Sequence, residues 1–293
     1  MMRKLLFTLA VFMIFGGLLY AEVPKKEKKV LIDLFHTTNG SDWTKKWDIK
    51  TPVSQWYGVK VVDDHVVEIN LFRNNLVGVI PQSIGKLKYL THLNLAFNGL
   101  TGQFPNEVTK LEGLKVLKLE MNRIKGEIPE NIGKMKSLEE LSLFNNFLNG
   151  SIPQSIGDIS GLKILNLSSN NLKGEIPSTI GNLTLLQSLG LFENTLDGTI
   201  PSELGNLVQL KELVLANNDL GGEVPKEFGQ LASLEVLQIQ NNKFNSVKSL
   251  EMMESKEFLV FDYDKEVEKI DFKNLNFSKT RMADTKFEDD NDK

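Results

Sequence analysis

The 293-residue sequence contains no cysteine. This absence excludes a disulfide scaffold, a thiol nucleophile and every cysteine-based zinc or iron–sulfur site. The sequence also lacks a basic excess, because 38 acidic residues outnumber 34 basic ones and leave a net charge of -4. Binding to nucleic acid needs a basic face, so no nucleic-acid partner is expected. With 41% hydrophobic and 25% charged residues, the chain can still bury a large core.

Motifs of catalysis and cofactor binding are absent as well. The sequence has only three histidines, His36, His65 and His92, and it has no H-E-x-x-H, G-x-S-x-G or phosphate-binding glycine loop. The acidic stretch EDDND near the C-terminus lacks the ligand spacing and the glycine of an EF-hand. We therefore expect no catalytic residue, no metal site and no cofactor, and we interpret the chain as not being an enzyme.

One long hydrophobic run is present, at the N-terminus. Arg3 and Lys4 precede residues 5–20, which are apolar apart from Thr8 and two glycines, and Ala21 follows. This is the order of a secretory signal peptide, and the run is short against the roughly 20 residues that span a bilayer. We predict a signal peptide over residues 1–21, a mature chain without a membrane span, and an exported protein that is secreted, periplasmic or on the cell surface. Retention of the segment as an anchor is the alternative.

Most of the prolines recur at a fixed interval of 24 residues. These are Pro81, Pro105, Pro129, Pro153, Pro177, Pro201 and Pro225. Blocks of 24 counted from Val66 give seven complete repeats and an incomplete eighth that begins at Leu234. In every complete block, positions 1, 4, 6, 11, 15, 19 and 22 are apolar. The period therefore predicts eight units over residues 66–246 that stack around one continuous core.

Each block has the same internal order of signals. The opening L-x-x-L-x-L alternates like a short β-strand, and the following G-x-I-P and I-G-x-L stretches predict loops or 3₁₀ turns. Position nine is always asparagine, and a buried amide there can satisfy backbone groups that are exposed where the chain leaves the strand. This predicted asparagine ladder consists of Asn74, Asn98, Asn122, Asn146, Asn170, Asn194, Asn218 and Asn242. Glycine at position thirteen indicates a turn that a side chain would obstruct, or a backbone with positive φ.

Different sequences flank the array, and a solenoid needs covers for the apolar faces of its two ends. Residues 22–65 are expected to form the N-terminal cap, with helical spacing over residues 25–38 and a strand hairpin around Asp63 and Asp64. The three tryptophans lie in this segment, and we interpret them as an aromatic lid rather than a ligand cage.

The repeat pattern weakens toward the C-terminus. Ser246 stands where glycine is expected and the following proline is missing, so the repeat is predicted to stop there. Residues 247–277 are expected to form the C-terminal cap. The polar segment 278–293 offers no apolar face and is expected to be disordered.

The repeated string L-x-x-L-x-L-x-x-N-x-L-x-G-x-I-P resembles the plant-type leucine-rich repeat. That family includes receptor-like kinase ectodomains, polygalacturonase-inhibiting proteins and exported bacterial proteins. The resemblance implies an α/β solenoid, a curved right-handed superhelix with a parallel concave β-sheet used for binding and with loops and 3₁₀ turns on the convex side. Residues 54–61 are similar to the C-x-W-x-G-V-x-C motif of the family's N-terminal cap, but both cysteines are absent. This departure favours the bacterial members with cysteine-free caps.

Positions 3, 5, 7 and 8 of each block are predicted to point out of the sheet. Large apolar side chains gather there in the first half of the array, and an exposed apolar patch usually marks recognition. A phenylalanine at position seven can instead simply cover the edge of its strand. We predict ligand contacts at Phe72, Arg73, His92, Phe97, Met121, Phe144 and Phe192. The expected partner is a protein, a peptide or a surface glycan, and inhibition of an extracellular hydrolase is the alternative function.

Overall fold

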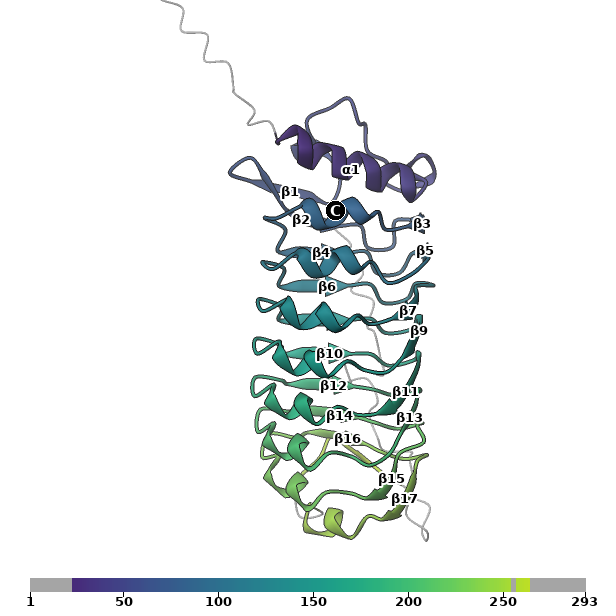
Figure 1. Ribbon diagram of the computed structural model, residues 1–293, viewed down its shortest axis with the longest axis vertical. Helices are drawn as coiled ribbons and strands as arrows, with labels where there is room; N and C mark the ends of the chain where they lie inside the picture. Colours follow the sequence, from purple (N-terminus) through teal and green to yellow (C-terminus); the bar gives the residue numbers. More distant parts are fainter. Residues whose placement is uncertain (1–22, 254–256, 264–293) are drawn as a thin grey trace, which may run out of the picture.

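The computed structural model describes residues 23–253 and 257–263. These residues form an elongated solenoid in which each turn of the chain is stacked on the preceding one (Figure 1). None of the helices in this described part is both long and apolar enough to cross a membrane. The predicted signal peptide over residues 1–21 and the polar segment 278–293 lie outside the described residues.

A ten-stranded sheet forms one side of the solenoid. It begins with the antiparallel hairpin of β1 (Val59–Val62) and β2 (His65–Asn70), as the sequence predicted. The strands added to it in parallel are β4 (His92–Asn94), β6 (Val116–Lys118), β8 (Glu140–Ser142), β10 (Ile164–Asn166), β12 (Ser188–Gly190), β14 (Glu212–Val214), β16 (Val236–Gln238) and β18 (Val260–Asp262). Leu165 pairs with Leu189, 24 residues later, so the sequence period is also the register of the sheet.

Short second strands line an adjacent side of the solenoid, which we call the flank (Figure 1). They form one four-stranded sheet and two pairs. The strands are β3 (Val77–Val79), β5 (Gly99–Thr101), β7 (Lys125–Glu127), β9 (Phe147–Gly150), β11 (Asn171–Glu175), β13 (Thr195–Asp197), β15 (Gly221–Glu223) and β17 (Lys243–Ser246). The sequence analysis predicted loops or 3₁₀ turns for these residues, because they do not alternate in hydrophobicity. Their pairing arises between turns, where equivalent extended segments lie side by side.

The remaining side of the solenoid carries the predicted 3₁₀ helices. They span Gln82–Lys86, Asn106–Lys110, Glu130–Lys134, Gln154–Asp158, Ser178–Asn182, Ser202–Asn206, Lys226–Gln230 and Lys248–Met253. A proline directly precedes each of the first seven, and its carbonyl accepts the bond that closes the turn, as Pro177 does from Ile180 N–H at 3.1 Å. Proline suits this place because its fixed φ ends the extended segment and it needs no hydrogen-bond acceptor.

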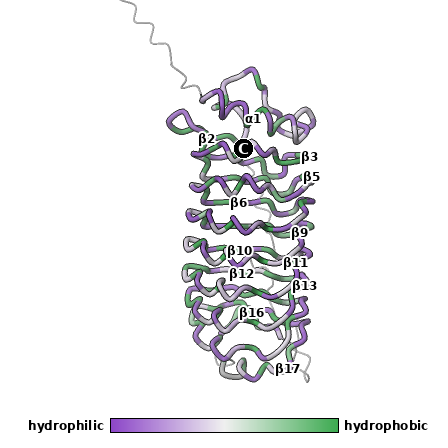
Figure 2. Tube along the Cα trace, viewed as in Figure 1, coloured by the Kyte–Doolittle hydropathy of each residue, from purple (hydrophilic) through white to green (hydrophobic). Residues whose placement is uncertain are grey.

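The interior of the solenoid is filled by the repeating apolar positions. Every residue at the seven predicted positions of the complete repeats belongs to the buried core. Hydrophobic and hydrophilic residues accordingly alternate within each turn of the chain (Figure 2). The glycines at position thirteen have positive φ, and at Gly78 (φ 132°) a Cβ would lie 2.1 Å from the Thr37 carbonyl oxygen. Core packing and backbone geometry therefore restrict the residue type at most positions of each repeat. The outward-pointing positions of the sheet remain variable.

Asparagines at position nine bond consecutive turns to one another. The amide of Asn146 donates to the carbonyls of Leu119 at 2.9 Å and Leu143 at 3.2 Å, and its Oδ1 accepts from Ile124 N–H at 3.0 Å. Equivalent donations to the strand of the preceding turn are made by Asn98, Asn122, Asn170, Asn194, Asn218 and Asn242. Asn74, the first of the series, instead bonds the backbone of Lys45 in the cap.

The N-terminal cap covers the first turn with a helix and three buried tryptophans. Helix α1 (Lys25–Thr37) lies across this end (Figure 1) and buries Leu31 and Leu34. The indole N–H of Trp43 donates to the Thr38 carbonyl at 2.9 Å, and the Trp47 and Trp56 rings stack with centroids 4.9 Å apart. All three indoles are at most 4% exposed, so they belong to the core and form no open ligand cage.

The solenoid continues past residue 246, where the sequence analysis placed the end of the repeats. Strand β18 pairs with β16 at the same 24-residue offset, and Val260 lies opposite Val236. Val247 takes the place of the missing proline, because its carbonyl accepts from Leu250 N–H at 2.9 Å. Phe261 of this last strand stacks on the ring of Phe258, with centroids 4.5 Å apart. Of the predicted C-terminal cap, residues 254–256 and 264–277 lie outside the described part.

We expect Asn146→Ala to lower the free energy of unfolding by about 1–3 kcal/mol, since buried backbone carbonyls would lose their donor. The measurement is a urea unfolding curve. Asn149→Ala is the matched control, because Asn149 belongs to the same repeat and its side chain is exposed on β9. Equal losses in the two variants would contradict the structural role of the buried amide.

Candidate ligand-binding surface

The side chains that point away from the core along the ten-stranded sheet form one continuous surface. On each parallel strand, positions 3 and 5 point outward while position 4 is buried, as for His92, Leu93 and Asn94. Positions 7 and 8 follow as the chain leaves the strand. We call the surface formed by these four positions of all repeats the outer sheet face. The side chains there are not needed to fill the core and are available for contact with a ligand.

All the sequence-predicted contact residues belong to the outer sheet face, but the apolar ones are less exposed than expected. Phe72, Phe97, Met121, Phe144 and Phe192 are half-buried, because neighbouring turns pack against them. The rings of Phe72 and Phe97 meet edge to face with centroids 5.1 Å apart. The apolar patch that was expected to be freely exposed is therefore half-buried.

Phe192 is separated from the other predicted contacts. It packs against a small apolar cluster of Val214, Val236 and Val260, which are at most 4% exposed. The sequence analysis missed this cluster because these valines come from three different turns. The predicted contact residues thus divide into a group on the first four repeats and a single ring near the C-terminal end.

Position eight has a left-handed backbone, which the sequence analysis did not predict. Arg73, Phe97 and Met121 have φ values of 47°, 56° and 55°. The same geometry recurs at Asn145, Ser169, Glu193, Asn217 and Asn241. Large side chains rarely adopt such φ values, whereas asparagine tolerates them, and its recurrence at this position was the available signal. Phe97 and Met121 therefore occupy positions where a smaller residue would fold with less strain.

A small polar hollow opens on the outer sheet face between the first four repeats. Its volume is about 260 Å³, and its lining residues are Glu68, Ile69, Asn70, His92, Asn94, Val116, Lys118 and Glu140. Lys118 Nζ lies 3.0 Å from Glu140 Oε1. His92 Nδ1 lies 2.8 Å from the Thr91 hydroxyl oxygen. The hollow therefore combines both signs of charge with hydrogen-bonding groups, on the same four repeats as the half-buried apolar side chains.

Glu120 is the buried acidic side chain of this region. It stands at position seven of the third repeat and is 9% exposed. Burial raises the pKa of the Glu120 carboxyl, while hydrogen bonds from its own backbone and from Ser142, together with the charge of Lys118, act in the opposite direction. Within the described residues, Glu120 Oε2 has no hydrogen-bond partner. The sequence analysis did not single out this residue, because its burial depends on neighbouring turns.

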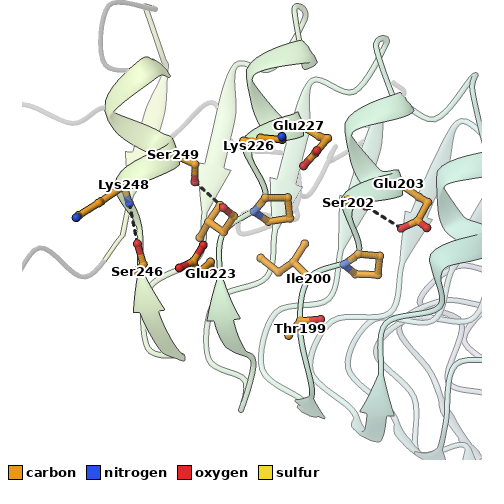
Figure 3. A pocket seen from close by; sticks show the side chains of 13 residues that line it. Thr199, Ile200, Ser202, Glu203, Glu223, Lys226, Glu227, Ser246, Lys248 and Ser249 are labelled. Carbon is orange, nitrogen blue, oxygen red and sulfur yellow. Dashed lines mark hydrogen bonds between the residues drawn. The ribbon is translucent and has the colours of Figure 1, made fainter.

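A larger cavity, of about 680 Å³, lies on the flank of the last repeats, away from the outer sheet face (Figure 3). Glu203, Glu223 and Glu227 contribute carboxylates to its lining. No set of three or more acidic or histidine side chains in the described part is arranged to hold a metal ion. The Ser249 hydroxyl in the lining donates to the Val224 carbonyl at 2.6 Å and thus serves the solenoid itself. The outer sheet face is therefore the better candidate for ligand binding.

Comparison with protein families defines the class of the chain. A leucine-rich repeat region model matches residues 146–271, and a Leucine Rich Repeat model matches residues 65–87, 89–111 and 113–135. Together these matches cover most of the solenoid. The chain therefore belongs to the leucine-rich repeat family, and its repeats are of the plant type. No curated protein sequence matches the chain.

Solved structures of plant receptors and of a bacterial protein share the fold. The Arabidopsis receptor kinase HAESA, in complex with the peptide hormone IDA and the co-receptor SERK1, is 28% identical with a TM-score of 0.72, over 82% of this chain and 41% of that one. The Arabidopsis thaliana GASSHO1/SCHENGEN3 ectodomain, in complex with CASPARIAN STRIP INTEGRITY FACTOR 2, is 31% identical with a TM-score of 0.67, over 77% of this chain and 31% of that one. A Leptospira interrogans leucine-rich repeat protein is 34% identical with a TM-score of 0.57, over 69% of this chain and 50% of that one. The matched part is thus at most half the length of each of these proteins.

We expect Glu120→Gln to raise the thermal midpoint at pH 7. The folded protein raises the pKa of this carboxyl, so the folded state binds the proton more tightly than the unfolded state does. Stability is therefore lost as pH rises from the unfolded pKa through the folded pKa, and glutamine removes that loss. The advantage of the variant should shrink as pH falls toward 4. Thermal melts from pH 7 down to pH 4 provide the measurement.

Glu139→Gln is the control for this pH series, with the opposite sign. Lys163 and Lys115 lower the pKa of the exposed Glu139 carboxyl. The stability from these ion pairs is present above the unfolded pKa and is lost as pH falls through the folded pKa, so this variant should not gain stability at pH 7. A Glu120→Gln variant that melts below the wild type at pH 7 would contradict the assignment of Glu120 as a buried, poorly compensated acid.

Proposed function

We propose that the chain is a non-catalytic, exported recognition protein whose outer sheet face binds a peptide or an extended segment of a protein. The observation that carries this proposal is the placement of large side chains where the fold does not need them. Phe97 and Met121 stand at left-handed positions where asparagine or serine is found in four of the other repeats. Strained residues kept on a surface beside a polar hollow are typical of binding sites.

The dimensions of the outer sheet face suit an extended ligand. The parallel strands from β2 to β18 are nine in number, and at about 4.8 Å per spacing they make a strip about 38 Å long. An extended chain of about 11 residues covers that length. Such a contact is compatible with an interface of about 800 Å² on each partner.

A peptide ligand is preferred to a surface glycan or a hydrolase because of the structural neighbours. The structure of the receptor kinase HAESA, which this chain resembles, contains a bound peptide hormone. Half-buried phenylalanines with adjacent hydrogen-bonding groups also suit the apolar side chains and backbone of a peptide.

Export rests on the N-terminal sequence. We expect the protein secreted from a bacterial host to begin after Ala21, as measured by intact mass and N-terminal sequencing. A membrane-bound product that retains residues 1–21 would contradict release of the chain and would favour the anchor.

The binding proposal is tested with a displayed library of random dodecapeptides, selected on the wild-type protein. For the selected peptide, Phe97→Asn combined with Phe144→Ser should weaken binding about 30-fold, equivalent to about 2 kcal/mol. The thermal midpoint should persist, because neither residue is part of the buried core and asparagine tolerates the left-handed backbone.

Ser169→Ala combined with Asn217→Ala is the matched control at position eight of later repeats, and its affinity should be unchanged. Loss of binding in this pair alone would move the contact to the C-terminal half. A glycan array is probed in parallel with the same protein. Binding of glycans, with no peptide selected from the library, would overturn the peptide proposal. If the wild-type protein turned over a substrate and the double phenylalanine variant did not, the proposal of a non-catalytic protein would be overturned.

A further inference from the structure

We propose that the bound peptide places a lysine or arginine side chain against Glu120, and that this contact sets the specificity of the outer sheet face. The inference rests on the proposed peptide-binding function and specifies its ligand. Nothing in the fold requires an acid at this place, because position seven of the neighbouring repeats holds Ala96 and Phe144.

The buried carboxylate of Glu120 is incompletely hydrogen-bonded. Glu120 is nine-tenths buried, and its Oε2 has no partner within the described residues. Burying a carboxylate is costly unless it is paired and hydrogen-bonded, and an unsatisfied buried acceptor in a native fold needs an explanation. Ser142 supplies only a neutral donor. A cationic donor from a ligand would satisfy both the free oxygen and the charge.

The neighbouring cation, Lys118, is already engaged in an ion pair. Lys118 lies on the same side of the strand as Glu120, but its ammonium is 3.0 Å from Glu140. His92, on the preceding strand, is hydrogen-bonded to the Thr91 hydroxyl. Neither side chain supplies the missing donor to Oε2 in the structure.

The outer sheet face as a whole is acidic. Its acidic residues are Glu68, Glu120, Glu140, Glu193 and Glu212, and its basic ones are Arg73 and Lys118. An acidic surface attracts cationic ligands and repels anionic ones. The rings of Phe97 and Phe144 belong to the repeats on either side of Glu120, and aromatic faces favour lysine and arginine. Charge and ring placement therefore agree on the same ligand group.

A second unsatisfied side chain on the outer sheet face indicates the direction of the ligand. Gln240 Oε1 is also buried without a partner in the described part of the chain, and Gln240 occupies position seven of the eighth repeat. Glu120 and Gln240 are five repeats apart, which corresponds to about 24 Å across the strands. An extended peptide covers this distance in about seven residues. A ligand that runs along the solenoid axis would thus bring its cation to Glu120 and a hydrogen-bond donor to Gln240.

Access to Glu120 requires a side-chain movement, because Oε2 is enclosed. Changes of side-chain rotamer at interfaces are common even where the backbone stays fixed. Ala96 on the preceding turn presents only a methyl group, so we expect the movement to be a rotamer change of Glu120 itself or of the half-buried Phe97 or Phe144 on the adjacent repeats.

The test uses three pools of dodecapeptides that are identical except for one fixed central residue, which is arginine, citrulline or glutamate. Citrulline has the shape of arginine without the charge. Binding of the full chain is measured by fluorescence anisotropy at pH 7. The arginine pool should bind at least tenfold more tightly than the citrulline pool. In Glu120→Gln this preference should fall to about twofold or less, reflecting loss of the charge-assisted hydrogen bond.

Glu175→Gln is the matched control, because Glu175 is exposed on β11, outside the outer sheet face. It removes the same charge and should keep the full preference for arginine. A folding defect is detected separately, since Glu120→Gln is expected to melt no lower than the wild type at pH 7.

The outcomes separate this inference from the proposed function. Equal binding of the arginine and citrulline pools, or a preference that survives in Glu120→Gln, would overturn the cationic contact while leaving peptide binding in place. Failure of every pool to bind would overturn the peptide function, and this inference with it.

Discussion

The hydrogen bonding of each turn to the next, at a constant offset of 24 residues, is the constraint on which the rest of the structure depends. One turn contributes too few buried side chains to offset the entropy of ordering its backbone, so it is stable only against its neighbours. Asparagine at position nine makes this coupling specific, as Asn146 donates both to its own turn and to the strand of the preceding one. The register of the ten-stranded sheet and the core filling follow from that offset, whereas the flank strands pair at 22 residues, as Lys173 does with Thr195.

The same constraint explains the two ends, where one neighbour is missing. At the N-terminal end, Asn74 bonds the backbone of Lys45 in place of a preceding turn, and α1 covers the apolar interior. At the other end, the ninth parallel strand keeps the register of Val236 with Val260, while aromatic rings take the place of leucine. Each end therefore uses bulky aromatic side chains where the regular repeats use aliphatic ones.

Sequence periodicity predicted the features that are repeated in every block, and it missed those that arise between blocks. The buried positions and the places of the seven 3₁₀ helices that follow a proline are predicted by residue types within one repeat. The strand hairpin is predicted by the cap sequence around Asp63 and Asp64. The flank strands result from pairing across turns, and the continuation past Ser246 depends on Val247 substituting for proline. On the candidate surface, the residues were predictable, but their half-burial and the enclosure of Glu120 depend on side chains of adjacent turns.

A repeat fold makes departures from its own pattern informative. Since every turn must satisfy the same core, ladder and turn requirements, the low-cost residue at a position is visible in its equivalents along the chain. Asparagine and serine at position eight define the low-strain choice, and Arg73, Phe97, Met121 and Glu193 depart from it. Alanine and serine at position seven show that no acid is required there, and Glu120 departs from that. All of these departures except Glu193 lie on the first three repeats. Residues that reduce stability without serving the fold are expected where a ligand binds.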